Sequence, residues 1–368
     1  MNIAFLGTRG VPSNYGGFET CVQELGQRLV RRGHEITVYC RKSYYNELLS
    51  KYLGMNLVYL PNINRKSLDT ISHTVWSMLH ALTQPFDVMM FFNVANSPCL
   101  VIPRLLGKNV VINTDGLEWK RGKWGKIGKL YFKISEFLAA KLASQIVSDS
   151  RGIQKYYLEK YAANSKYIAY GAYISGSCKP DILSSLGVKP SDYFLQITRF
   201  EPENNALLTI QAYKKLKTEK KLVIVGGVAY QSEYSRSILE EANERIILPG
   251  FIYNADILNE LWCNCYAYIH GNEVGGTNPA LLQTMASGCF CIAIGVAFNS
   301  DVLRDCGIYY KKDPDDLAMK MMWTLQNSEQ LASYKFKAQQ RIKEKYSWEK
   351  VTDGYEKLFK ELVEGRCK

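Results

Sequence analysis

Short apolar runs alternate with amphipathic stretches from the first residue of the chain. The amphipathic stretches have the period of a helix, most clearly over 18–32, where Val22, Leu25 and Leu29 fall on one face and Gly33 follows as a helix stop. Alternation of short strands with helices is typical of α/β proteins with parallel sheets. In the first half, the apolar runs predict strands at 2–6, 35–40, 56–60, 87–92, 109–113 and 145–148.

A second alternating series follows a segment rich in Gly, Ser, Pro and Lys over 172–191, which predicts a linker. From Asp313 onward the pattern is helical, and its last stretch, 348–363, has apolar residues at helical spacing. We therefore expect two Rossmann-like α/β domains that face each other. The strands predicted in the second half are 193–197, 222–225, 246–248, 265–269 and 289–294.

Composition is that of a globular protein, with 47% hydrophobic and 22% charged residues, which excludes disordered and collagen-like classes. The ten cysteines are scattered, and the C-x-C pairs Cys263/Cys265 and Cys289/Cys291 lie in apolar, strand-like runs. Reduced, buried thiols in a cytosolic protein are favoured over a metal site.

The first six residues are too short for a signal peptide. The uncharged stretch 274–300 is broken by polar residues, which favours a buried site over a membrane helix.

The net charge of +11 belongs to the first half of the chain. Residues 1–180 have 23 Lys+Arg against 11 Asp+Glu, whereas residues 181–368 have 23 against 24. A basic half beside a neutral half points to an anionic partner, which could be a nucleic acid, a membrane surface or a phosphorylated substrate.

Two glycine-rich loops each lie between a strand and a helix. In the first, Gly7 and Gly10 follow the opening strand, and Gly16-Gly17 precedes the helix. In the second, Gly275-Gly276 is followed by polar side chains that could hold a phosphate or sugar hydroxyls. Exposed amides at a helix start favour a phosphate. The first loop lacks the G-x-G-x-x-G spacing of dinucleotide sites, and a tight turn or a helix cap is the alternative for each loop. The polar side chains of the second loop and its helix are Thr277, Asn278 and Gln283.

Arg199 directly follows the apolar run 193–198, at the edge where α/β sheets bind ligands, and its planar guanidinium suits a diphosphate. The alternative is a surface ion pair with Glu201 or Glu203. Asp313-Pro314-Asp315-Asp316 has D-x-D spacing but is better explained as a helix N-cap than as a metal site.

A basic and aromatic run covers 119–133, with six Lys or Arg and no acid. This composition suits an interface with anionic lipid headgroups, or single-stranded nucleic acid. A solvated helix with aromatics packed in the core is the third alternative. Asp115 and Glu118 precede the run as carboxylates at the edge of a cleft. The members of the run that we assign to an acceptor or membrane surface, together with Glu118, are Trp119, Lys120, Arg121, Lys123 and Trp124.

Together these motifs resemble the family 4 glycosyltransferases, which are retaining enzymes of the GT-B fold, over nearly the whole chain. The segments 116–121, 202–205 and 275–279 are similar to a bacterial subgroup that includes rhamnosyltransferases of surface polysaccharide assembly. The resemblance implies an acceptor-side domain at 1–176 and a nucleotide-sugar domain at 177–345. It also implies a final helix at 346–368 that returns to the first domain.

The resemblance also implies roles for residues at matching positions. Gly16 matches a glycine whose amide meets the donor diphosphate, and Arg199 matches the arginine that neutralises it. Asn204 stands where the family usually has a lysine, and the family's E-x7-E glutamates fall on Gly275 and Gln283. We therefore expect Glu273, two residues before Gly275, and Gln283 to take donor-side roles. Asp115 lies near the position where many members have a histidine close to the reacting sugar, so the resemblance implies a catalytic role for Asp115, together with Arg199 and Glu273. The remaining expected donor contacts are Gly17, the base-framing Gly250 and Phe251, and Gly276, Thr277 and Asn278.

The reaction implied is transfer of a sugar from a nucleotide diphosphate with retention at the anomeric carbon and with no metal or other cofactor. The expected donor is dTDP-rhamnose, and the expected acceptor is a lipid-linked saccharide at the inner face of the plasma membrane. This predicts a cytoplasmic, peripheral protein that binds an anionic membrane surface and no nucleic acid. The alternatives are a nucleotide-sugar epimerase of the same fold, a basic nucleic-acid-binding protein, or a transferase that has lost activity with its two glutamates.

Overall fold

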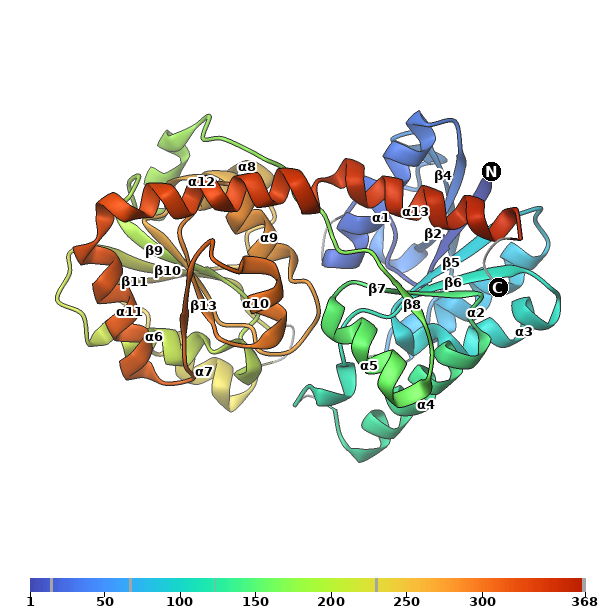
Figure 1. Ribbon diagram of the computed structural model, residues 1–368, viewed down its shortest axis with the longest axis horizontal. Helices are drawn as coiled ribbons and strands as arrows, with labels where there is room; N and C mark the ends of the chain where they lie inside the picture. Colours follow the sequence, from blue (N-terminus) through green and yellow to red (C-terminus); the bar gives the residue numbers. More distant parts are fainter. Residues whose placement is uncertain (14–15, 66–67, 123, 229–230, 366–368) are drawn as a thin grey trace. The chain divides into compact units, whose positions relative to one another are not determined.

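The computed structural model describes residues 1–13, 16–65, 68–122, 124–228 and 231–365. The chain forms two compact units (Figure 1). Unit 1 contains Met1–Tyr170 and Trp348–Lys368, and unit 2 contains Gly171–Ser347. The final helix therefore belongs to unit 1, as the resemblance implies.

Unit 1 is built on one sheet with the strand order β3-β4-β2-β1-β5-β6-β7-β8. Every neighbouring pair is parallel except β3 and β4. The central strand β5 is apolar and buried along its whole length because helices cover a parallel sheet on both faces. The strands are β1 (Asn2–Leu6), β2 (Glu35–Arg41), β3 (Lys51–Tyr52), β4 (Met55–Leu60), β5 (Val88–Phe92), β6 (Asn109–Asn113), β7 (Gln145–Ser148) and β8 (Ser165–Tyr167).

Most of these strands are followed by a helical segment before the chain re-enters the sheet. The helices are α1 (Gly17–Arg31), α2 (Asp69–Leu82), α3 (Val101–Leu105), α4 (Lys126–Leu142) and α5 (Arg151–Tyr161), with 3₁₀ turns η1 (Lys42–Tyr44), η2 (Val94–Leu100) and η3 (Glu118–Lys120). The C-terminal helix α13 (Trp348–Val363) packs on α1. Arg28 of α1 donates to Glu349 at 2.9 Å, and the Tyr355 hydroxyl accepts from Asn113 at 2.9 Å. The apolar face predicted for 348–363 is buried in unit 1.

Unit 2 contains an all-parallel sheet with the order β11-β10-β9-β12-β13-β14. Helices flank this sheet in Figure 1, and their apolar side chains form one core with the strands. The strands are β9 (Tyr193–Ile197), β10 (Lys221–Val225), β11 (Ile246–Gly250), β12 (Ala267–His270), β13 (Cys291–Ile294) and β14 (Ile308–Tyr310). The helical segments are η4 (Pro180–Leu186), η5 (Pro202–Asn204), α6 (Ala206–Lys214), α7 (Glu233–Leu239), α8 (Ala255–Asn264), α9 (Pro279–Ala286), α10 (Ala297–Leu303), α11 (Pro314–Gln326), η6 (Ser328–Gln330), α12 (Leu331–Arg341) and the π-helical η7 (Ile342–Tyr346).

Two details differ from the sequence predictions, and two agree with them. Cys263 lies in α8 and Cys265 caps its end, so this C-x-C pair is not in a strand. Cys289 precedes β13, which begins at Cys291. The cysteines within the described residues are all free. Asp313 caps α11 by accepting from the amide of Asp315, which confirms the interpretation of that acidic segment as a helix start.

Candidate functional site

The strand order of unit 2 reverses between β9 and β12. The strands β10 and β11 extend the sheet on one side of β9, and β12 to β14 extend it on the other. In an open parallel sheet, ligands bind at the carboxyl edge beside such a reversal, because the loops there diverge and leave a crevice. The segments that leave β9 and β12 at this edge are 198–205 and 271–278, which contain the main motifs predicted in the second half of the sequence.

Direct hydrogen bonds join these two loops. The side-chain amide of Asn205 donates to the carbonyl of Gly271 at 2.8 Å, and the Glu273 amide donates to the carbonyl of Glu203 at 3.0 Å. A Cβ on Gly271 would lie 2.4 Å from the Asn204 carbonyl oxygen, so only glycine allows this approach. The two motifs therefore form one rigid surface.

Arg199 lies partly buried at this edge. Among the described residues, no hydrogen bond or ion pair of its guanidinium is found, so the predicted alternative of a pair with Glu201 or Glu203 does not appear there. The side-chain amide of Asn204 donates to the Arg199 carbonyl at 2.9 Å and fixes the turn that presents the arginine. Asn204 itself is buried, which gives it a positioning role where we expected a donor contact.

The 271–278 loop ends in a capped helix. Asn278 caps α9 by accepting from the amide of Ala280 at 2.9 Å, which is the alternative considered for this segment, and Thr277 is buried. Gly275, followed by Gly276, has a φ of 148°, a conformation that side chains rarely adopt. The glycine pair therefore brings backbone close to the edge of the sheet, where a diphosphate could approach it.

Two predicted donor-side residues already have protein partners. The Glu273 carboxylate accepts from Lys312 at 2.7 Å and from the amide of Asn205. The amide nitrogen of Gln283 donates to the Tyr173 carbonyl at 3.2 Å and to the Ser287 hydroxyl at 3.2 Å. The Glu273 pairing suits a residue that holds the loop better than one that removes a proton.

An aromatic platform follows β11 at the same edge. Phe251 comes directly after Gly250, and its ring stacks on that of Tyr253, with centroids 6.0 Å apart at 20°. The Phe251 ring also lies over Gly227, where a Cβ would come within 2.9 Å of it. Both rings are exposed, as a platform for a nucleobase requires. The Gly226-Gly227 pair was missed by the sequence analysis, although a glycine pair directly after an apolar strand was a usable signal.

His270 ends β12 beneath this surface, and its burial predicts how the stability of the protein depends on pH. The ring is fully buried, and neither ring nitrogen has a partner in the described part of the chain. Burial lowers the pKa of His270 to about 4, so the folded protein holds it neutral. Because the unfolded chain takes up the proton from about pH 6.5 downward, we expect wild-type stability to fall by on the order of 3 kcal/mol between pH 6.5 and pH 4 from this residue.

The check is chemical denaturation of wild type and His270→Gln across this range. The buried His73 in unit 1 has its pKa lowered in the same way, so both proteins lose stability in acid. The stability advantage of wild type over the variant should shrink as the pH falls. An advantage that stays constant from pH 7 to pH 4 contradicts the assignment.

Unit 1 presents its own glycine loop where its strand order reverses between β1 and β5. Gly16, with a φ of 96°, precedes α1, which begins at Gly17, and no side chain of the described residues caps the helix. The first-turn amides can therefore meet an anion. The buried Glu19 accepts from the amide of Arg9 at 3.0 Å, and burial raises the pKa of its carboxyl. Glu19 thus holds this loop in place, a role the sequence analysis missed.

Asp115 lies past the carboxyl end of β6 with a φ of 54°. Its amide donates to the side chain of Asn113 at 3.1 Å, which stabilises this left-handed turn. Asp115 is partly exposed on the same edge of the unit 1 sheet as the glycine loop. The predicted catalytic role of Asp115 stays a prediction.

The first part of the basic run 119–133 is not the outward-facing surface that we expected. Arg121 is buried and donates to the carboxylate of Glu118, and the Trp124 indole also donates to Glu118 at 3.4 Å. The ion pair with the Glu118 carboxylate therefore holds the Arg121 guanidinium in a buried position. Lys120 and Lys133 lie over the Trp119 ring at 5.7 and 5.0 Å. Lys123 lies outside the described residues.

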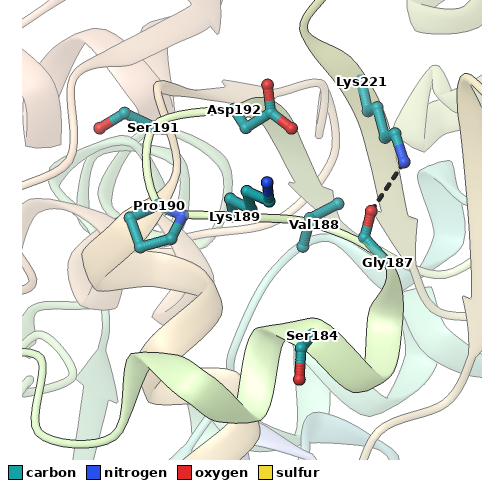
Figure 2. Close-up of a pocket in the computed structure, with 8 residues that line it drawn as sticks. All are labelled: Ser184, Gly187, Val188, Lys189, Pro190, Ser191, Asp192 and Lys221. Carbon is teal, nitrogen blue, oxygen red and sulfur yellow. Dashed lines mark hydrogen bonds between the residues drawn. The ribbon is translucent and has the colours of Figure 1, made fainter.

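A pocket of about 650 Å³ lies at the other edge of the unit 2 sheet (Figure 2). It is bordered by Lys221, the first residue of β10, and by Asp192, which precedes β9. Lys221 donates to the carbonyl of Gly187 at 2.7 Å, which closes its ammonium group onto the end of η4. This pocket is at the amino ends of the strands and is separate from the loops described above.

Two further observations bear on metals and membranes. Within the described ranges, no three His, Cys, Asp or Glu side chains are grouped as metal ligands. In the same part of the chain, no helix combines the length and the apolar character needed to cross a membrane.

The two halves of the chain match two different protein families. Residues 181–341 match the family "Glycosyl transferases group 1", and residues 1–173 match a domain of unknown function, DUF1972. The chain is similar to the N-acetylgalactosamine-N,N'-diacetylbacillosaminyl-diphospho-undecaprenol 4-alpha-N-acetylgalactosaminyltransferase of Campylobacter jejuni. The two are 24% identical over 221 residues, which are 57% of this chain and 59% of that relative.

Solved structures share the fold. Sucrose-phosphate synthase from Thermosynechococcus elongatus has a TM-score of 0.85 at 15% identity, covering 99% of each chain. HepE from Anabaena, solved with UDP, has a TM-score of 0.78 at 15% identity, covering 98% of this chain and all of that one. The chain has the two-domain α/β architecture of the GT-B fold, and the match to the glycosyl transferases group 1 family lies within unit 2.

Proposed function

We propose that the protein is a retaining glycosyltransferase that moves a sugar from a nucleoside diphosphate to a lipid-linked saccharide. The observation that supports this most strongly is the Arg199 guanidinium at the strand-order reversal of unit 2, which has no partner among the described residues and lies beside a glycine loop with close backbone approach. The group 1 domain covers this edge of the sheet. The HepE structures with UDP and with UDP-glucose support a nucleotide-sugar donor.

The chain's own groups suit the chemistry of the leaving diphosphate. Departure of a nucleoside diphosphate leaves negative charge on its phosphate oxygens and positive charge on the sugar ring. Arg199 neutralises the phosphates through a planar, two-donor fork, and the amides around Gly275 and Gly276 add fixed dipoles. The platform of Phe251 and Tyr253 receives the base. The proposal assigns no metal to this step.

The acceptor assignment rests on two observations. The relative from Campylobacter jejuni acts, by its name, on a sugar linked to diphospho-undecaprenol. The first half of this chain has a net charge of +12 from 23 basic and 11 acidic residues, which suits an anionic lipid diphosphate. We propose that the protein works at the cytoplasmic face of the plasma membrane in the assembly of a bacterial surface polysaccharide. The segments 116–121, 202–205 and 275–279 resemble a bacterial subgroup that includes rhamnosyltransferases. The first donor to test is therefore dTDP-rhamnose.

The test incubates the purified protein with dTDP-rhamnose, UDP-sugars or GDP-sugars and a polyprenyl-diphosphate saccharide in vesicles, with EDTA or with magnesium. We expect one nucleotide class to give an acceptor extended by one sugar in EDTA, with the anomeric configuration of the donor retained. Mass spectrometry detects the extension and NMR gives the configuration. A free epimerised nucleotide sugar would instead identify an epimerase. No product with any donor, at confirmed folding, contradicts the proposal.

A further inference from the structure

Helix α4 has an unusual outer face. Its inner face is buried at helical spacing and packs into unit 1 through Phe132, Ser135, Glu136 and Ala139. The opposite face is apolar as well. Its side chains are exposed by 86% for Ile127, 58% for Leu130, 49% for Ile134 and 49% for Phe137. A surface helix normally turns charged and polar residues outward, so this α4 stripe (Ile127, Leu130, Ile134 and Phe137) calls for a partner.

The charges on α4 have a single sign at its surface. Four lysines lie along the helix, and its one acid, Glu136, is buried, where it accepts from Tyr156 at 2.7 Å and from Tyr161 at 2.9 Å. The outer surface of α4 therefore consists of apolar side chains flanked by ammonium groups. The four lysines are Lys126, Lys129, Lys133 and Lys141.

The adjoining segment has the same character. The Tyr131 hydroxyl of α4 donates to the carbonyl of Ala95 in η2 at 2.6 Å, and η2 runs directly into α3. Leu105 and Leu106 at the end of α3 are 82% and 61% exposed, and Arg104 precedes them. Figure 1 shows α4 at the margin of unit 1, with α5 beside it. The end of α3 is thus a second exposed apolar segment with a basic neighbour in the same unit.

We infer that the α4 stripe and its lysines form the surface on which this protein binds an anionic lipid bilayer, with α4 lying in the headgroup plane. The apolar side chains reach the acyl boundary while the lysines contact the phosphates, the arrangement typical of interfacial helices. The absence of an exposed acid on the described part of α4 favours anionic lipid over a mixed-charge protein surface. The inference rests on the proposed function in one respect, because a lipid-linked acceptor requires the enzyme at a membrane.

This surface differs from the one predicted from the sequence. Within the described residues 119–122 and 124, Lys120 is exposed, but Arg121 is buried and Trp124 packs on Phe132 with ring centroids 5.0 Å apart. The exposed large apolar side chains begin at Ile127, beside the exposed Lys126. The contact is therefore made by the helix that follows the basic run.

The test measures sedimentation of the full chain with phosphatidylcholine vesicles that contain or lack phosphatidylglycerol. The variant combines Ile127→Ser, Leu130→Ser and Ile134→Ser, all at exposed positions. We expect wild type to partition onto the anionic vesicles only, and the variant to lose at least about tenfold in partition coefficient. A second variant, Lys126→Glu with Lys129→Glu, should lose about as much at low salt. The matched control in unit 2 combines Met319→Ser, Met322→Ser and Phe336→Ser, which are similarly exposed, and should bind as wild type does.

Unchanged vesicle binding of the α4 variant overturns the inference. It is also overturned if wild type ignores vesicles and light scattering shows a dimer that the variant dissolves, because the stripe would then be a protein interface. Loss of vesicle binding together with failure of every donor in the transfer assay would leave the membrane surface established and refute the proposed function instead. Binding of nucleoside diphosphate should be equal in wild type and the α4 variant.

Discussion

Replacement of Arg199 by alanine is expected to lower kcat/KM for the nucleotide-sugar donor by about a hundredfold to a thousandfold. That is the range typical of removing one preorganised donor from a developing negative charge. The guanidinium is partly buried at the carboxyl edge and has no ion-pair partner among the described residues, so its charge is available to the leaving diphosphate. Steady-state kinetics at varied donor concentration measures the loss, which should fall on kcat as well as on KM.

Two variants make the result specific. Arg199→Lys keeps the charge without the planar fork, so it should lose less activity than alanine but still fall well below wild type. Arg245→Ala removes an arginine whose guanidinium donates to the Thr218 carbonyl at 2.8 Å and which precedes β11 at the amino edge, so it should keep wild-type kinetics. Equal kinetics for Arg199→Ala and wild type would remove Arg199 from the site.

Gly271→Ala is expected to damage both stability and activity. A Cβ at this position would meet the Asn204 carbonyl oxygen at 2.4 Å and the Gln196 amide nitrogen at 2.9 Å, and both groups are buried. The loop after β9 must shift to make room, at a cost of about 1–3 kcal/mol, as for other overpacked sites. The same shift moves the Asn204 amide that fixes the turn of Arg199, so donor turnover should fall as well.

Gly176→Ala serves as the control for Gly271→Ala. A Cβ on Gly176 would meet no atom within 4 Å, and its backbone does not have a positive φ. This variant should unfold at the same denaturant concentration as wild type and transfer sugar at the same rate. If Gly271→Ala is as stable and as active as Gly176→Ala, the two loops are not the rigid unit described here.

Most strands of the two sheets could be predicted because they are largely apolar runs. β1, β6, β7 and β9 have the bounds expected from the pattern. Three short strands were missed. β3 has two residues, and β8 and β14 have three each, too few for a periodic signal. Their place in the sheets depends on neighbouring strands, which a local pattern does not contain.

The candidate site could be predicted in part for the same reason. Arg199 and Gly275-Gly276 follow apolar strands, so position alone marked them as residues of the carboxyl edge. The holding role of Asn205 could not be predicted, because its partner Gly271 is 66 positions away and becomes a neighbour only when β12 pairs with β9. The composition of the basic run was visible, but the inward turn of Arg121 depends on its bond with Glu118.

The central claim is that the strand-order reversal of unit 2 binds the diphosphate of the donor. The most direct test is a crystal structure of the protein with dTDP or UDP, according to which nucleotide stabilises it. We expect a phosphate oxygen within hydrogen-bond distance of the Arg199 guanidinium, another near the amides of the 275–277 loop, and the base beside Phe251. A nucleotide bound at another edge of the sheet, with Arg199 free of phosphate, would contradict it.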